Sequence, residues 1–138
     1  MDDVLLNKVA IINRCLDRIR EEYKGFEDQL ATNFTKQDSI ILNIQRACQA
    51  TIDIGNRILA LQKASAPQES REIFEELQNR KLISPELSHR MKMMVGFRNI
   101  AVHEYQRLDI NILKAVIEKH LDDLREYGET VLAAHLNE

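Results

Sequence analysis

Residues 84–105 read SPELSHRMKMMVGFRNIAVHEY, and this stretch decides how the chain is expected to fold. Ser84 followed by Pro85 is typical of a helix N-terminus, because serine caps free N–H groups and proline fits the first helical position. Apolar residues then recur three and four residues apart through residues 87–94. This spacing predicts a helix that begins at Pro85, buries one face and carries the rest of the stretch at its far end.

The apolar face of this helix continues to a charged residue, Arg98. Burying an unpaired charge is costly, so Arg98 must either have a partner or open into a cleft where an anion binds. The methionines that precede it, Met91, Met93 and Met94, are expected to pack in the core.

His103 falls on a different row of the same helix, above Gly96 and close to Lys92 and Asn99. A glycine inside a helix costs roughly 1 kcal/mol relative to alanine. Close approach of a second helix or a ligand is a common compensation. Arg98 and His103 are five residues apart, which is about 140° around a helix with 3.6 residues per turn. A site that uses both therefore needs a distorted helix end or a second copy of the chain.

The charges of the chain are unevenly distributed. The net charge of −3 argues mildly against a nucleic-acid partner. Between residues 80 and 98, however, Glu86 is the only acid, and the basic residues are Arg80, Lys81, Arg90, Lys92 and Arg98. The approach to the motif is therefore expected to be locally positive and able to bind phosphate.

The composition indicates an all-α protein, because 138 residues contain only four glycines and two prolines and no alternating β-branched strands. Four long helices and one short helix are expected, packed as an up-and-down bundle in a single domain over residues 1–138. Thr35 resembles the start of a capping box, and Asp109 is expected to cap the last helix. The expected ranges are about 4–23, 35–63, 70–79, 85–103 and 109–134.

Several classes of site and location are disfavoured. Cys15 and Cys48 form no C-x-x-C pair and are expected to be small core residues in a reducing compartment. No signal peptide or apolar run of membrane-spanning length is present, so a cytoplasmic protein without membrane contact is expected. The sequence has neither an H-E-x-x-H pattern nor a glycine-rich nucleotide loop, so no metal and no cofactor are expected. His89, His120 and His135 lie outside any motif and are interpreted as surface or core residues.

Arg98, His103 and Tyr105 form an Arg-x4-His-x-Tyr pattern at the end of the predicted helix. This pattern resembles the signature of the HEPN superfamily, specifically the HepT type of ribonuclease toxin that is paired with a minimal nucleotidyltransferase (MNT) antitoxin. The resemblance covers nearly the whole chain, because the family uses a small helical bundle of this kind. It implies a homodimer in which Arg and His of both protomers face a shared cleft.

The chemistry of the motif suits cleavage of RNA, which carries its own nucleophile in the 2′-hydroxyl. The reaction needs a proton-transfer group of near-neutral pKa and a cation for the charge that develops at phosphorus. His103 and Arg98 provide these, and Asn99 could orient the imidazole or bind the scissile phosphate. Lys92 and Gly96 are expected to support RNA binding beside them. The products would be a 2′,3′-cyclic phosphate and a 5′-hydroxyl, formed without a metal.

The resemblance also implies how the toxin is neutralised: the antitoxin transfers AMP to the motif tyrosine, here Tyr105. This residue falls in the predicted loop before Asp109. A second function remains open, because some HEPN domains are non-catalytic helical modules that bind a nucleotide or a nucleotidyltransferase partner. In that case Arg98 and His103 would be structural residues.

Overall fold

The computed structural model describes residues 2–103 and 108–137, apart from the side chains of Val102 and His103. Within these residues the chain forms α-helices, one short 3-10 helix and no strand, which confirms the expected all-α class. The helices are α1 (Asp3–Tyr23), α2 (Phe34–Leu61), α3 (Ser70–Asn79), α4 (Pro85–His103), α5 (Ile110–Lys119) and α6 (Leu121–Leu136), and the 3-10 helix is η1 (Glu27–Gln29).

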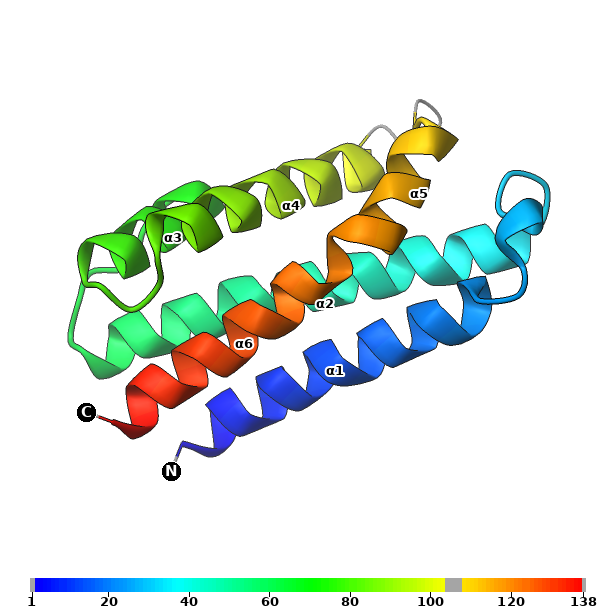
Figure 1. Ribbon diagram of the computed structural model, residues 1–138. Coiled ribbons are helices and arrows are strands. Elements are labelled where there is room, and N and C mark those ends of the chain that lie inside the picture. The colour runs from blue at the N-terminus through cyan, green and yellow to red at the C-terminus, as the bar shows by residue number, and fades with distance from the viewer. Residues whose placement is uncertain (1, 104–107, 138) are drawn as a thin grey trace.

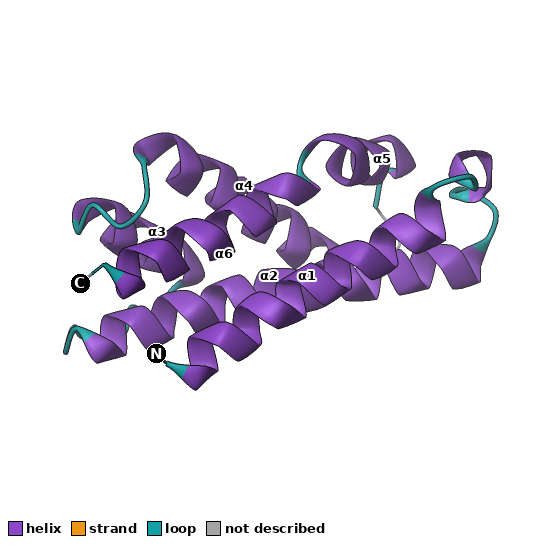
Figure 2. Ribbon diagram, turned by 60° about the horizontal axis from the view of Figure 1, so that its bottom comes forward, coloured by secondary structure: helices purple, strands orange, loops and turns teal. Residues whose placement is uncertain are grey.

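The helices form an elongated bundle around α2, which packs against α1, α3, α4 and α6. Figure 1 shows α1 and α2 running antiparallel along the length of the molecule, with α4 and α6 on one side of this pair. The two ends of the chain lie close together at one end of the bundle, and α4 ends towards the other (Figures 1 and 2). The motif helix therefore carries its last turn away from both termini.

The core is apolar and includes one tyrosine that joins three helices. Tyr127 on α6 is fully buried, and its hydroxyl donates to the Thr51 carbonyl oxygen on α2 at 2.8 Å. Its ring meets that of Phe74 on α3 edge-on, with 5.6 Å between the ring centroids. Cys15 and Cys48 are buried and free, as expected. None of the described helices combines the length and apolar character that crossing a membrane requires.

Two of the three predicted helix caps are confirmed and one is wrong. The Leu87 N–H donates to Ser84 Oγ at 3.0 Å, and the Asn111 N–H donates to Asp109 Oδ1 at 2.8 Å. Helix α2, however, begins at Phe34, because Asn33 accepts the Lys36 N–H at 3.1 Å and acts as the cap in place of Thr35. Asparagine is at least as good a cap as threonine, so the helix begins directly after Asn33.

The last helix was expected to be continuous over 109–134, and this expectation is wrong. The chain bends at His120, where φ is −123° and ψ is −6°, and α5 and α6 are separate helices on either side. Both sides of the bend are held to the end of α1. Tyr23 donates to Glu118 Oε1 at 2.5 Å, and Arg20 donates to Asp122 Oδ1 at 2.5 Å. These contacts stabilise the bend.

Gly55 allows α2, α3 and α6 to approach closely. A Cβ at this position would overlap Ile73 Cγ2 and lie 3.2 Å from the Tyr127 hydroxyl oxygen. We expect Gly55→Ala to lower the free energy of unfolding by about 1–3 kcal/mol, because the overlap outweighs the helix propensity that alanine adds. Urea unfolding followed by circular dichroism measures this change.

Gly128→Ala is the matched control, since a Cβ there would meet Val9 and Ile12 at ordinary contact distances of 3.6 Å or more. This variant should be unchanged or more stable by up to about 1 kcal/mol. Equal stabilities of the two variants would contradict the close packing inferred at Gly55.

Candidate active site

Among the described residues, the partners of Arg98 are neutral amides and not an acid. Its Nη2 donates to Gln49 Oε1 on α2 at 2.6 Å, and its Nη1 donates to Asn99 Oδ1 at 3.1 Å. Its Nε is buried and has no hydrogen-bond partner among the described residues. Since amide oxygens carry no net charge, the guanidinium keeps its full positive charge and can attract an anion.

Arg98 lies at the edge of the core rather than inside it. Cys48, one residue from Gln49 on α2, is fully buried and packs its thiol near the Met94 carbonyl oxygen at 3.8 Å. Burial raises the pKa of the Cys48 thiol to about 12, although the nearby charge of Arg98 acts in the opposite direction. Cys48 therefore stays protonated and does not neutralise Arg98.

The other two motif residues are only partly covered by the structure. His103 is the last residue of α4, and its side chain lies outside the described part of the chain. Tyr105 lies outside the described residues altogether. Helical geometry still separates positions 98 and 103 by about 140°. Arg98 faces α2, whereas position 103 continues the row of Gly96.

The structure corrects the expectation that the surface leading to the motif is positively charged. Acids on α3 and α6 pair with three of the five cations of residues 80–98, and the acids that pair with Arg90 and Lys92 are distant in sequence. The ion pairs are Arg80 Nε to Glu76 Oε1 at 2.7 Å, Arg90 Nη1 to Asp123 Oδ1 at 2.7 Å and to Glu126 Oε2 at 2.8 Å, and Lys92 Nζ to Glu75 Oε1 at 3.1 Å. Counting charges within one stretch missed these partners, and among the described residues Arg98 has amide partners alone.

Gly96 is exposed, and apart from the adjoining backbone of α4 no described atom lies within 4 Å of the position that a Cβ would take. The close approach predicted for this glycine is therefore not made by the described residues of one chain. Asn99 is also exposed, next to Arg98 on the surface of α4. Lys92 is held against α3 by its ion pair with Glu75.

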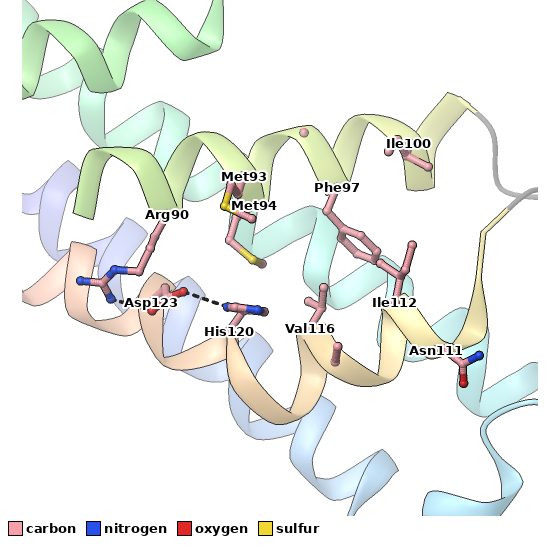
Figure 3. A pocket seen from close by; sticks show the side chains of 12 residues that line it. Arg90, Met93, Met94, Phe97, Ile100, Asn111, Ile112, Val116, His120 and Asp123 are labelled. Atoms are coloured by element: carbon pink, nitrogen blue, oxygen red, sulfur yellow. Dashed lines mark hydrogen bonds and ion pairs between the residues drawn. The ribbon is translucent and has the colours of Figure 1, made fainter. Parts of the chain in front are cut away.

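A groove of about 530 Å³ lies between α4 and α5, and we call it the apolar groove. Figure 3 shows Met93, Phe97 and Ile100 of α4 facing Ile112 and Val116 of α5 across it. Met93 was expected in the core, but 57% of its surface is exposed, and Ile100 and Ile112 are similarly exposed at 48% and 53%. The sequence pattern does not predict this groove, because the apolar residues that line it have the same helical spacing as core residues.

Polar residues close one end of the apolar groove. Asp123 accepts a hydrogen bond from Arg90, and its other oxygen lies 3.4 Å from His120 Nδ1 (Figure 3). His120 thus belongs to the bend between α5 and α6, and His89 is exposed on α4. Among the described residues, no three His, Cys, Asp or Glu side chains are grouped so that they could hold a metal ion.

Comparisons with known proteins agree with the helical architecture. A family model described as "Ribonuclease HepT-like" matches residues 12–131. The chain is 45% identical to an mRNA nuclease HepT of Shewanella oneidensis, over 96% of this chain and 99% of that protein. It is 30% identical to a tRNA nuclease HepT of Aphanizomenon flos-aquae, over 78% of this chain and 74% of that protein.

A solved structure has the same fold with a TM-score of 0.90 at 45% identity, over 96% of this chain and 99% of that one. It is described as a tri-AMPylated Shewanella oneidensis HEPN toxin in complex with an MNT antitoxin. The family match spans α2 to α5 completely and most of α1 and α6. This chain therefore belongs to the HepT-like ribonuclease family of HEPN domains.

Proposed function

We propose that this protein is the toxin of a toxin–antitoxin pair and acts as a metal-independent endoribonuclease. The observation that carries the proposal is the Arg98 guanidinium, which is held by amide oxygens and not neutralised by a carboxylate among the described residues. The relatives named mRNA nuclease and tRNA nuclease support RNA as the substrate.

Arg98 is proposed to bind the scissile phosphate. Its hydrogen bond to Gln49 fixes the guanidinium at the protein surface, so that its remaining N–H groups are oriented before RNA arrives. Such preorganised donors stabilise charge that develops in a transition state, and the loss of one typically lowers kcat by about 10²–10³-fold. Asn99, which accepts from Arg98, would add an amide donor beside the same phosphate.

His103 is proposed to move the proton. As a general base it would take the proton of the 2′-hydroxyl, and the 2′-oxygen would then attack phosphorus. The bond from phosphorus to the 5′-oxygen breaks, and that oxygen takes up a proton. The products are a 2′,3′-cyclic phosphate and a 5′-hydroxyl end. Lys92 supports the site indirectly in this proposal, because its ion pair with Glu75 holds α4 against α3.

A second copy of the chain is proposed to cover the apolar groove. The exposed side chains of Met93 and Ile100 lie on the α4 face that includes Gly96, and position 103 is the next on this face. A helix from a partner could approach closely at Gly96, where no other described element of the same chain lies within 4 Å of a Cβ position. A two-fold dimer would then place His103 of each copy at the interface and create one composite cleft.

The antitoxin is proposed to transfer AMP to Tyr105. In this reaction the tyrosine oxygen attacks the α-phosphorus of ATP and pyrophosphate leaves. Tyr23 and Tyr127, the other two tyrosines, are buried and hydrogen-bonded to Glu118 and to Thr51, so they are poor acceptors. The description of the Shewanella oneidensis complex as tri-AMPylated supports this kind of neutralisation. The added phosphodiester would compete for the cation that RNA needs.

The first prediction from this proposal concerns catalysis. Arg98→Ala and His103→Ala should each lower cleavage of RNA by at least about 10²-fold, because they remove the phosphate-binding cation and the proton-transfer group. Cleavage by the unaltered protein should persist in EDTA. Gel assays with end-group analysis of the products measure both.

Arg71→Ala and His89→Ala are matched controls, because both residues are exposed and Arg71 has no ion pair among the described residues. These variants should cleave normally. An activity that EDTA removes and a divalent ion restores would refute the metal-free mechanism. If the unaltered protein binds RNA and never cleaves it, the non-catalytic alternative is correct.

The second prediction concerns assembly. Met93→Glu and Ile100→Glu place a carboxylate in the apolar groove and should convert a dimer into a monomer with impaired cleavage, since burying that charge is costly. Light scattering coupled to size-exclusion chromatography measures the mass. Leu136→Glu, at an equally exposed apolar position on α6, should remain dimeric. A monomer that cleaves RNA at the full rate would show that no composite cleft is needed.

The third prediction concerns neutralisation. Tyr105→Phe should keep ribonuclease activity and escape inactivation by the antitoxin and ATP, because it lacks the acceptor oxygen. Intact-mass spectrometry should find adenylyl groups on the unaltered protein and on Tyr23→Phe, and none on Tyr105→Phe. Adenylyl groups that persist on Tyr105→Phe would place the modification on another residue.

A further inference from the structure

A second hollow, of about 290 Å³, lies between α1 and α2, and we call it the polar cleft. In contrast to the apolar groove, most of its lining side chains can donate hydrogen bonds. The donors include Lys8, Arg14, Asn43, Arg46 and Gln49, and Asp53 lines the cleft as an acceptor. The HepT family motif does not include any of these residues.

Two arginines of the polar cleft lack acidic partners. Arg14 on α1 and Arg46 on α2 are exposed, and neither forms an ion pair within the part of the chain that the structure describes. Several other surface arginines are paired with carboxylates, for example Arg57 with Asp2 and Arg125 with Asp17.

Arg14 and Arg46 line the polar cleft together with Cys15. Burial raises the pKa of the Cys15 thiol, which lines the cleft, and the charges of Arg46 and Arg14 both act against that shift. Both guanidinium groups are therefore close enough to Cys15 to affect it. Among the described lining residues Asp53 is the only acid, and it already binds Lys8 at 3.0 Å. The free charge of the cleft is therefore positive.

Gln49 connects the polar cleft to Arg98. Its Oε1 accepts from Arg98 Nη2 at 2.6 Å, while its Nε2 donates to Asp53 Oδ1 at 3.0 Å inside the cleft. Arg46 precedes Gln49 by three residues on α2, so the two side chains are neighbours with about 5–6 Å between their Cβ atoms. Arg46 of the cleft thus lies next to Gln49, which is the hydrogen-bond partner of Arg98.

We propose that the polar cleft binds the phosphate backbone of single-stranded RNA beside the scissile phosphate, with Arg46 and Arg14 contacting successive phosphates. This inference rests on the proposed function of Arg98. A strand that places one phosphate on Arg98 can continue past Gln49 into the cleft. Arginine suits this role, because its planar fork binds phosphate oxygens in pairs. The amide groups of Asn43 and Gln49 can bind sugar or base without adding charge.

The test measures binding without turnover. The probe is a fluorescent mixed-sequence oligonucleotide of 2′-O-methyl RNA, which lacks the nucleophile and cannot be cleaved. The double variant Arg14→Gln/Arg46→Gln should raise the Kd about tenfold or more at about 50 mM salt. With two fewer phosphate contacts at about 0.7 each, the slope of log K against log salt should become shallower by about 1.4.

The charge-matched control is Lys63→Gln/Arg71→Gln. Both residues are exposed, at the end of the bundle where α2 leads into α3, and neither has an ion pair among the described residues. This control loses the same net charge, so it corrects for the general attraction of RNA. Its Kd should change less than about twofold, and its salt slope should stay the same. Arg14→Lys/Arg46→Lys should retain most of the binding, which separates loss of charge from loss of structure.

The outcomes separate this inference from the proposed function. If the cleft variant and the control bind RNA equally while the unaltered protein cleaves RNA, the polar cleft is not part of the site and the catalytic proposal stands. If the unaltered protein does not cleave RNA but the cleft variant still loses binding, the cleft is confirmed and the catalytic proposal fails. A cleft variant that binds as tightly as the unaltered protein overturns the inference in either case.

Discussion

Arg98 must remain charged at the edge of an apolar core, and the site depends on how that charge is satisfied. A carboxylate partner would stabilise the guanidinium, but it would also compete with any phosphate for the same donors. The amide oxygens of Gln49 and Asn99 satisfy two donors without cancelling the charge. The arrangement costs some stability relative to an ion pair and leaves the cation able to bind an anion.

Helix α2 connects this charge to the rest of the molecule. It holds Gln49 on the surface facing Arg98, and within the core its Thr51 carbonyl accepts from Tyr127. At Gly55 the same helix lets α3 and α6 pack closely. Because one continuous helix carries all three features, the position of Gln49 is coupled to the packing of the core.

The sequence predicted local features well and long-range ones poorly. The caps at Ser84 and Asp109 follow from residues one to three positions apart, and both are present. The bend at His120 was not predictable, because apolar residues keep their helical spacing through it and no proline or glycine marks it. The exposure of Met93 was missed for a related reason, since an apolar face looks the same whether the chain or a partner covers it.

The proximity of the two termini, far from the last turn of α4, has a practical consequence (Figure 1). A fluorescent protein or an immobilisation tag attached to either end would leave the motif end of the bundle accessible to long polymers. Two dyes, one near each terminus, would report whether the end of the bundle that holds the termini stays closed, independently of events at the motif. Single-molecule measurements on the intact chain are therefore feasible without altering α4.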